Sequence, residues 1–167
     1  MNDNLILLPV TDPTSLQAIA GLAKKIWTEH YLPILGQQQI DYMLERFQSV
    51  HAMQCQITEE GHEYYLIRLD GQNAGYIGVK PDEKGLFLSK LYVDKAFRRR
   101  GIAARVLNVL TGRCLTESRP VIWLTVNKYN EGSIAAYRAL GFSIVRDEVT
   151  DIGNGYVMDD YIMEKNV

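Results

Sequence analysis

The sequence predicts an α/β fold in which a mixed β-sheet carries helices on both faces. Three features support this prediction: apolar residues at helical spacing near the amino terminus, β-rich runs broken by turn residues in the middle, and a helical stripe between two strand-like runs. At 167 residues, with 47% hydrophobic and 23% charged residues, the chain has the size and composition of one globular domain. We therefore expect a single domain over residues 1–167.

The opening segment predicts a strand followed by two helices. Leu5–Val10 has the length and composition of a short strand, and Thr14 or Ser15 is positioned to cap a helix. A second helix is expected after Gly36. The first helix has apolar positions at helical spacing, namely Leu16, Ile19, Leu22, Ala23, Ile26 and Trp27, and the second has Ile40, Met43, Leu44 and Phe47 on one face.

Three consecutive strands are predicted in the middle of the chain. The runs EYYLIRL, AGYIGVK and LFLSKLYV are rich in β-branched and aromatic residues, and the turn segments DGQN and PDEKG separate them. Short turns of this kind join antiparallel neighbours, so this part should form an antiparallel meander.

The periodicity then becomes helical and returns to that of strands. VIWLTV, Val121–Val126, is a nearly continuous apolar run typical of a strand covered on both faces. A helix between it and LFLSKLYV makes a right-handed crossover with parallel strands. A second helix from Glu131 to Leu140 should end at Gly141, before the strands FSIVRDEV and YVMDDYIMEK. The crossover helix is predicted from the stripe Ala103, Val106, Leu107, Leu110 and Cys114. The sheet is thus expected to be mostly antiparallel, with one central parallel βαβ pair.

Composition excludes several classes of function. A net charge of -2 and a pI near 5.9 argue against nucleic-acid binding, so any anion site must be local. Cys55 and Cys114 form neither a disulfide framework nor a metal-ligand spacing, and His30, His51 and His62 are scattered, so no metal site is predicted. The start of the chain lacks a signal-peptide pattern and no run reaches the length of a membrane span, so we expect a cytoplasmic protein without membrane contact.

Three arginines precede the predicted crossover helix. The first turn of a helix leaves about four backbone N–H groups without partners and carries about half a positive charge, which suits a phosphate. A glycine there permits a tight turn, and small side chains leave room for the ligand. A solvated helix entrance is the alternative interpretation. The segment comprises Arg98, Arg99, Arg100, Gly101, Ile102, Ala103 and Ala104, and we call it the arginine turn.

Two ordered motifs resemble those of the GNAT superfamily of N-acetyltransferases. LYVDKAFRRRGIA is similar to the acetyl-CoA signature at Arg98, Gly101 and Ala103. It departs from the signature at three positions. Lys95 stands where many members have proline, Arg99 stands where many have glycine, and at Ala103 glycine is more common. The flanking segments IWTEHYLPILGQQQIDYMLERF and IGNGYVMDDYIMEK resemble a bacterial branch that includes the polyamine acetyltransferase PaiA. The segment TVNKYNEGSIAAYRALGF resembles the next family motif at Asn127, Asn130, Ser133, Ala136, Tyr137, Gly141 and Phe142.

The resemblance implies a GNAT-like fold, acetyl-CoA as the acetyl donor and direct transfer to a primary amine of a small molecule, such as a polyamine, or of a peptide. It implies that the diphosphate lies on the arginine turn and that Tyr137 protonates the departing thiolate. Asn130 is a helix cap, a cofactor contact or both. The pantetheine arm is expected along the backbone of Leu91, Tyr92 and Val93, where the N–H near Leu91 can hold the acetyl carbonyl.

The general base is left open by the sequence. The strand that enters the signature has Ser89 and Lys90 where many relatives have a glutamate. Ordered water is one alternative, and a second is a group on the substrate side, among Glu29, His30, Tyr31, Asp159 and Asp160. A CoA-binding sensor or scaffold without catalysis is the alternative function, and a homodimer is the default assembly.

Overall fold

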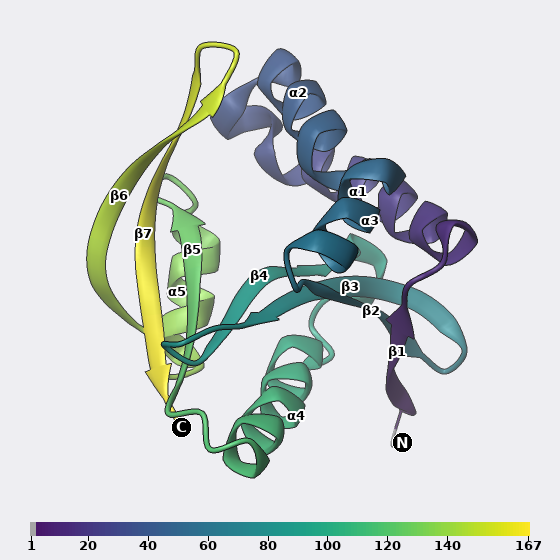
Figure 1. The fold of residues 1–167 in the computed structure, drawn as a ribbon, viewed down its shortest axis with the longest axis vertical. Helices are drawn as coiled ribbons and strands as arrows, with labels where there is room; N and C mark the ends of the chain where they lie inside the picture. Colours follow the sequence, from purple (N-terminus) through teal and green to yellow (C-terminus); the bar gives the residue numbers. More distant parts are fainter. Residues whose placement is uncertain (1–2) are drawn as a thin grey trace. The chain divides into compact units, whose positions relative to one another are not determined.

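The computed structural model describes residues 3–167, and its packing divides the chain into two compact units (Figure 1). The first unit contains the residues up to Lys80 together with Lys90–Val106, and the second contains Pro81–Ser89 and Leu107–Val167. Strand β4, Leu86–Val93, and helix α4, Ile102–Thr116, each run from one unit into the other. A single domain over residues 1–167 remains our prediction, because the chain passes between the units inside continuous elements.

The first unit combines three helices with the strands β1, β2, β3 and the second half of β4, in that order. The predicted opening strand and the helix after Gly36 are confirmed. A third helix, α3, was not expected; Ser49 has an extended backbone that ends α2, and its hydroxyl accepts a hydrogen bond from the N–H of Ala52. The elements are β1 Leu5–Val10, α1 Pro13–Leu35, α2 Gln37–Gln48, α3 Val50–Glu59, β2 Glu63–Leu69 and β3 Gln72–Pro81.

The predicted cap of α1 at Thr14 or Ser15 is wrong. Asp12 is the capping residue, and its carboxylate accepts a hydrogen bond from the N–H of Ser15 at 2.9 Å. Pro13 occupies the first helical position, which suits its fixed φ and missing donor. The helix therefore begins before Thr14, and Ser15 supplies a donor in place of a cap.

Strands β2 and β3 of the first unit carry buried residues on both of their faces. Leu66 and Tyr76 pair across β2 and β3, and the Tyr76 hydroxyl donates to Gln48 of α2 at 2.7 Å, so this face lies against the helical layer. On the opposite face Ile67 and Ile77 have no exposed surface. Figure 1 shows α3 and the start of α4 on opposite sides of β2 and β3, so helices cover both faces as predicted.

The second unit orders its strands as β4-β5-β7-β6, and its elements confirm the predicted crossover. The first half of β4 pairs in parallel with β5 through Leu86 with Ile122 and Phe87 with Trp123, while β7 pairs antiparallel with β5 and β6. Gly141 has a φ of 99° and ends α5 as predicted. The remaining elements are β5 Val121–Asn127, α5 Glu131–Ala139, β6 Ser143–Gly153 and β7 Tyr156–Asn166.

The prediction that Val121–Val126 is covered on both faces is wrong. Ile122 and Leu124 are buried, but Thr125 between Leu124 and Val126 is exposed and Trp123 is half-buried. Trp123 and Thr125 occupy the second face, and each carries a polar group that tolerates contact with solvent. Although its sequence is nearly continuously apolar, β5 therefore has one buried face and one face that is partly open to solvent.

Candidate functional site

The arginine turn places unpaired backbone donors at the start of α4. A short 3-10 helix, Lys95–Phe97, follows β4, and α4 begins at Ile102 after Gly101, which has a φ of 68°. The first hydrogen bond of α4 runs from the N–H of Arg105 to the carbonyl of Gly101 at 3.1 Å. Within residues 3–167, the N–H groups of Ile102, Ala103 and Ala104 have no hydrogen-bond acceptor. These donors are available to an anion.

The backbone conformation of Arg99 shows how this chain accommodates an arginine where the family signature often has glycine. Its φ is 64°, in the left-handed region that a side chain disfavours and glycine adopts readily. The position where many relatives have glycine therefore needs that conformation here too. Arg99 adopts it at a conformational cost of about 1 kcal/mol.

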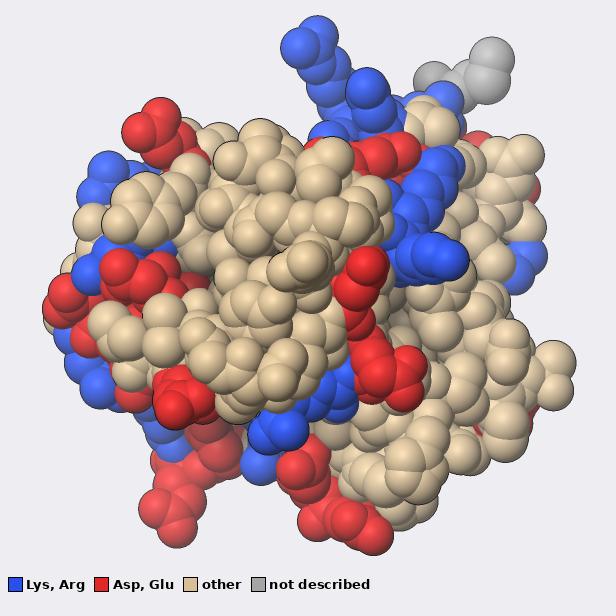
Figure 2. Space-filling model, turned by 90° about the horizontal axis from the view of Figure 1, so that it is seen from above, with Lys and Arg blue, Asp and Glu red and all other residues tan. Residues whose placement is uncertain are grey.

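The three arginine side chains of the turn are exposed, and none forms an ion pair with any carboxylate of the described chain. The Arg98 Nε donates to the carbonyl of Val93 at 3.2 Å, and the Arg100 guanidinium lies 5.6 Å from the centre of the Phe97 ring. Figure 2 shows one face of the molecule, on which basic and acidic side chains are interspersed among other residues. The guanidinium groups of Arg98, Arg99 and Arg100 are therefore open to a ligand, although Arg98 also feels the charge of Asp94.

Asp94 anchors the segment that leads into the turn, and sequence reasoning missed it. Its carboxylate pairs with the Lys25 Nζ at 2.9 Å and accepts a hydrogen bond from the N–H of Ala96 at 3.1 Å, while its own N–H donates to the carbonyl of Ala74 at 2.8 Å. Burial opposes ionisation, but the hydrogen bonds from Lys25 and Ala96 outweigh it, so the pKa of Asp94 lies below its ordinary value. An aspartate whose side chain accepts from the N–H two residues later is a common turn signal, and an aspartate directly after a predicted strand was readable in the sequence.

The end of β4 lies against aromatic side chains of α1 and β3. The Tyr92 ring centre is 5.5 Å from that of Trp27 and 5.6 Å from that of Tyr76. The hydroxyls of Tyr92 and Tyr31 hydrogen-bond to each other at 2.9 Å. The structure thus brings Tyr31, a predicted substrate-side residue, to a strand segment predicted to hold pantetheine.

The other two predicted residues of α1 differ in their surroundings. Glu29 is exposed, whereas His30 is half-buried with its ring edge-on to Tyr31 at 4.9 Å between centres. Burial, with a smaller contribution from the positive charge of Arg98, lowers the pKa of His30 below its ordinary value. His30 is therefore neutral near pH 7 and able to accept a proton.

In the second unit, α5 holds the predicted acid. Tyr137 is half-buried, with its ring edge-on to Phe142 at 5.5 Å between centres. Asn130 is buried and caps α5, because its side-chain oxygen accepts a hydrogen bond from the N–H of Ser133 at 3.3 Å. The helix that carries Tyr137 is thus fixed at its first turn.

Asp159 is engaged by a lysine. Its carboxylate lies 3.0 Å from the Lys128 Nζ, which also pairs with Asp147 at 2.8 Å. Hydrogen bonds from Lys128 to Asp147 and then to Asp159 raise the pKa of Lys128 well above its ordinary value. The neighbouring Asp160 is buried. The Asp159 carboxylate is therefore already paired and is not open to a substrate amine.

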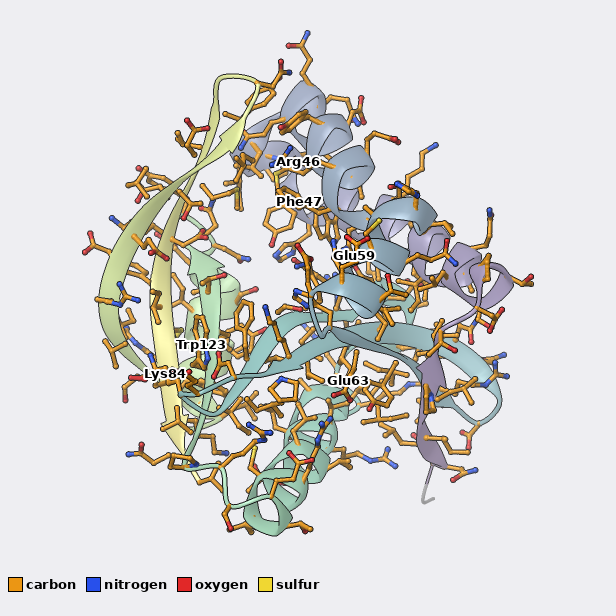
Figure 3. The ribbon with its side chains drawn as sticks, viewed as in Figure 1. Arg46, Phe47, Glu59, Glu63, Lys84 and Trp123 are labelled. Atoms are coloured by element: carbon orange, nitrogen blue, oxygen red, sulfur yellow. The ribbon has the colours of Figure 1, made fainter. Side chains whose placement is uncertain are left out.

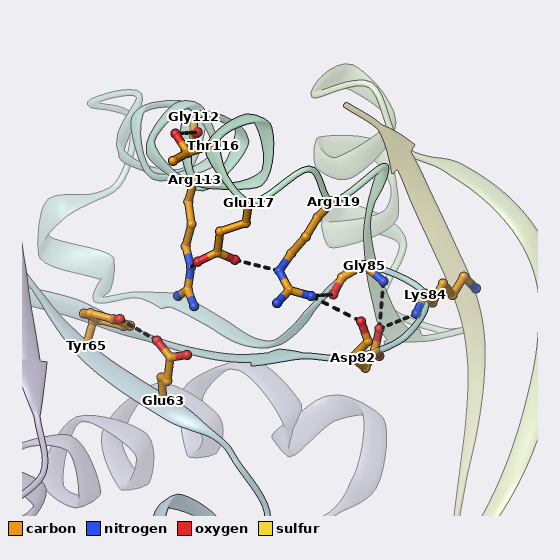
Figure 4. Close-up of polar contacts among 10 residues, drawn as sticks. All are labelled: Glu63, Tyr65, Asp82, Lys84, Gly85, Gly112, Arg113, Thr116, Glu117 and Arg119. Atoms are coloured by element: carbon orange, nitrogen blue, oxygen red, sulfur yellow. Dashed lines mark hydrogen bonds and ion pairs between the residues drawn. The ribbon is translucent and has the colours of Figure 1, made fainter.

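A second glycine-containing turn lies between β3 and β4 and is held by side chains of the second unit (Figure 4). The Asp82 carboxylate accepts hydrogen bonds from the N–H groups of Lys84 and Gly85 at 3.0 and 2.8 Å. It also accepts one from Trp123 Nε1 at 2.9 Å. Arg119 donates to the carbonyls of Asp82 and Gly85 at 3.2 and 3.1 Å. We call this set the Asp82 corner.

Two other contacts between a cation and an aromatic ring involve residues labelled in Figure 3. In the first unit the Arg46 guanidinium lies 5.4 Å from the centre of the Phe47 ring. In the second unit the Lys84 Nζ lies 5.1 Å from the centre of the Trp123 ring and 2.6 Å from Glu164. These contacts stabilise surface side chains and bring no group to the arginine turn.

Over residues 3–167 no cluster of three or more His, Cys, Asp or Glu side chains is placed to bind a metal. No helix in that range is long and apolar enough to cross a membrane.

Comparison with known proteins identifies the family. A model of the acetyltransferase (GNAT) family matches residues 21–142. An uncharacterized N-acetyltransferase of Lactobacillus delbrueckii subsp. lactis is 25% identical over 118 residues, which cover 66% of this chain and 68% of the relative. An uncharacterized N-acetyltransferase of Mycobacterium tuberculosis is 22% identical, with 92% of this chain and 99% of the relative covered.

Solved structures share the fold. The PaiA N-acetyltransferase of Thermoplasma acidophilum, in complex with coenzyme A, aligns with a TM-score of 0.80 and 18% identity, covering 98% of this chain and 99% of the other. An acetyltransferase of Thermus thermophilus aligns with a TM-score of 0.75 and 18% identity, covering 98% of this chain and 97% of the other. The chain belongs to the GNAT acetyltransferase family, so it is an acyltransferase that uses acetyl-CoA as the acetyl donor.

Proposed function

We propose that the protein moves an acetyl group directly from acetyl-CoA to a primary amine of a small molecule or peptide, with a polyamine as the first acceptor to test. The observation that carries the donor side is the arginine turn, where the free N–H groups of Ile102, Ala103 and Ala104 coincide with the acetyl-CoA signature. The polyamine is suggested by the resemblance of the flanking segments to the branch that includes the polyamine acetyltransferase PaiA.

The arginine turn binds the diphosphate of acetyl-CoA in this proposal. Its backbone donors and its three exposed guanidinium groups suit phosphate oxygens. The pantetheine arm lies along the backbone of Leu91, Tyr92 and Val93. The N–H near Leu91 holds the acetyl carbonyl and stabilises the oxyanion of the tetrahedral intermediate, which in comparable sites contributes about 3 kcal/mol.

Tyr137 supplies the proton to the departing thiolate. Tyrosine in model peptides has a pKa of about 10, so a tyrosine side chain can donate a proton at neutral pH. Replacing Tyr137 by Phe should lower kcat about 100-fold, a typical contribution of a general acid, while the Kd for acetyl-CoA stays within about twofold. Tyr129→Phe is the matched control, because Tyr129 is 69% exposed in the loop before α5. An unchanged kcat for Tyr137→Phe would remove the residue from this role.

The acceptor is expected near Glu29, His30 and Tyr31 on α1, and Asp159 is the fourth proposed acceptor-side residue. Glu29 offers an exposed carboxylate to a cationic amine, and His30 is neutral and able to take up its proton. Because Asp159 is paired with Lys128, its contribution requires that the pair opens. A cytoplasmic location and a homodimer complete the proposal.

The proposal is tested by release of free thiol from acetyl-CoA in the presence of polyamines, other small amines and peptides. Release with at least one amine, and acetyl-CoA binding by calorimetry, are expected. Binding without release for any amine would instead favour a silent CoA-binding sensor, and neither binding nor release would reject both functions.

A further inference from the structure

Strand β4 is fixed from its β3 side at the segment proposed to hold the acetyl group. A Cβ added to Gly75 would overlap the carbonyl oxygen of Tyr92 and press on the Cα of Val93, so the two strands approach too closely for any side chain there. The N–H of Asp94 also donates to the carbonyl of Ala74 at 2.8 Å. The backbone at Tyr92 therefore has little freedom toward β3.

The Tyr92 side chain is held from the α1 side by both its ring and its hydroxyl. Trp27 and Tyr31 of α1 are 2% and 8% exposed and Tyr92 is half-buried, so the α1 side of this contact is shielded from solvent. The hydroxyl of Tyr76, the third aromatic neighbour, donates a hydrogen bond to the side-chain oxygen of Gln48 at 2.7 Å. Tyr31 is the residue whose hydroxyl bonds to that of Tyr92, at 2.9 Å. This part-buried bond, together with the ring contacts, favours one orientation of the Tyr92 side chain.

Tyr31 also belongs to the helical segment proposed to meet the acceptor. Its ring is in edge contact with His30, and Glu29 lies just before His30 in the same helix. One hydroxyl pair thus joins the acceptor-side segment of α1 to the donor-side segment of β4 inside the first unit.

We propose that the Tyr31–Tyr92 hydroxyl pair positions the β4 backbone at Leu91–Val93, and through it the acetyl carbonyl, relative to α1. Tyr31 and Tyr92 are positioning residues in this proposal: the pair sets the orientation of the reacting groups and leaves the diphosphate contacts unchanged. The inference rests on the proposed function. Small errors in the orientation of reacting groups reduce turnover more than affinity.

The test uses Tyr31→Phe, Tyr92→Phe and the double variant, each of which keeps the ring and removes only oxygen atoms. Either single change should lower kcat about tenfold, because the hydroxyl bond that sets the orientation of the acetyl carbonyl relative to α1 is lost. The KM and Kd for acetyl-CoA should stay within about twofold, because the diphosphate contacts are untouched. The double variant should lose no more than either single variant, since the two hydroxyls act through one bond.

Tyr65→Phe is the matched control, because Tyr65 lies in the same unit and its hydroxyl donates to Glu63 at 2.7 Å; its kcat should not change. A kcat of Tyr31→Phe within about twofold of wild type, or an equal loss in kcat and acetyl-CoA affinity, overturns the proposal.

A second readout does not depend on activity. Amide hydrogen exchange in the ligand-free protein should become about tenfold faster at Leu91–Val93 in Tyr31→Phe, with no change at β2. Unchanged exchange at these residues overturns the inference even if the enzyme is active. A wild-type protein that neither binds acetyl-CoA nor releases thiol rejects the proposed function, and the exchange measurement still decides whether the hydroxyl pair holds the strand.

Discussion

The arginine turn and the Asp82 corner both join glycine to arginine at the end of a strand, yet their donors are used in opposite ways. In the Asp82 corner the N–H groups of Lys84 and Gly85 and the guanidinium of Arg119 all bond to protein oxygens. Arg119 also pairs with Glu117 at 2.6 Å. In the arginine turn, three backbone N–H groups and two of the three guanidinium groups have no protein oxygen as partner within residues 3–167.

The difference shows what distinguishes a binding turn from a structural one. Each turn has basic residues and a glycine, so local composition does not separate them. The two turns differ in what their nearby carboxylates bind. Asp82 and Glu117 accept hydrogen bonds from the donors of the Asp82 corner, whereas Asp94 beside the arginine turn binds Lys25 and the N–H of Ala96. Donors without a protein partner are the ones available to a ligand.

The largest loss of folding stability is expected from a change in the Asp82 corner. Asp82→Ala removes the acceptor of three hydrogen bonds, one of them from Trp123, and should lower the free energy of unfolding by about 2 kcal/mol. Urea denaturation measures this loss. Glu83→Ala is the control, because Glu83 is exposed and a surface change of this kind stays within about 0.5 kcal/mol. Equal losses for the two variants would mean that the corner has no special structural role.

At the arginine turn the effect should appear in binding and not in folding. Arg98→Ala removes one charged phosphate donor, so the Kd for acetyl-CoA should rise about tenfold, and less at high salt. The free energy of unfolding should change by less than about 0.5 kcal/mol, because Arg98 is exposed. Titration calorimetry at two salt concentrations provides the measurement, with the exposed Arg46→Ala as control. A large loss of stability without loss of affinity would make the turn structural, like the corner.

Glycine substitutions sharpen the same contrast. Gly101→Ala places a side chain at a φ of 68° and should destabilise the fold by about 1 kcal/mol. Gly112 lies inside α4, the helix that follows Gly101, and no atom is within 4 Å of an added Cβ, so Gly112→Ala should stabilise the fold by about 0.5–1 kcal/mol. Thermal unfolding of the two variants is the measurement. The same sign of change for both would contradict the left-handed geometry of the turn.

The smallest effect concerns pH and links His30 to the turn. Since burial and Arg98 lower the pKa of His30 in the folded state, the unfolded chain binds the proton more tightly. Stability is therefore full above the unfolded pKa of about 6.5 and falls as the pH decreases below it. His30→Gln should reduce the difference in urea midpoint between about pH 7.5 and about pH 5.5. An undiminished difference would show that His30 does not contribute to it.

Much of the fold was predictable because its signals are local. The meander, the crossover and the end of α5 at Gly141 follow from periodicity and turn residues, and the structure has them. The errors were local as well: α3 continues the helical layer after a single extended residue, Ser49, and Thr125 is exposed within an apolar run. Boundaries and burial depend on neighbours that one sequence window does not contain.

The candidate site was predictable only where its residues are contiguous. The arginine turn is one segment, so its glycine and arginines were readable together. Lys25 and Asp94 are 69 residues apart in the chain, and Tyr31 and Tyr92 are 61 apart. No spacing rule connects residues at such separations; only the packing of α1 on β4 does.

The central claim is that the free N–H groups of the arginine turn bind the diphosphate of acetyl-CoA. Titration of isotope-labelled protein with CoA, and separately with pantetheine, which lacks the diphosphate, tests it through the amide resonances of Ile102, Ala103 and Ala104. We expect these resonances to shift with CoA and to remain in place with pantetheine. CoA binding that shifts other amides and leaves these three unmoved would contradict the claim.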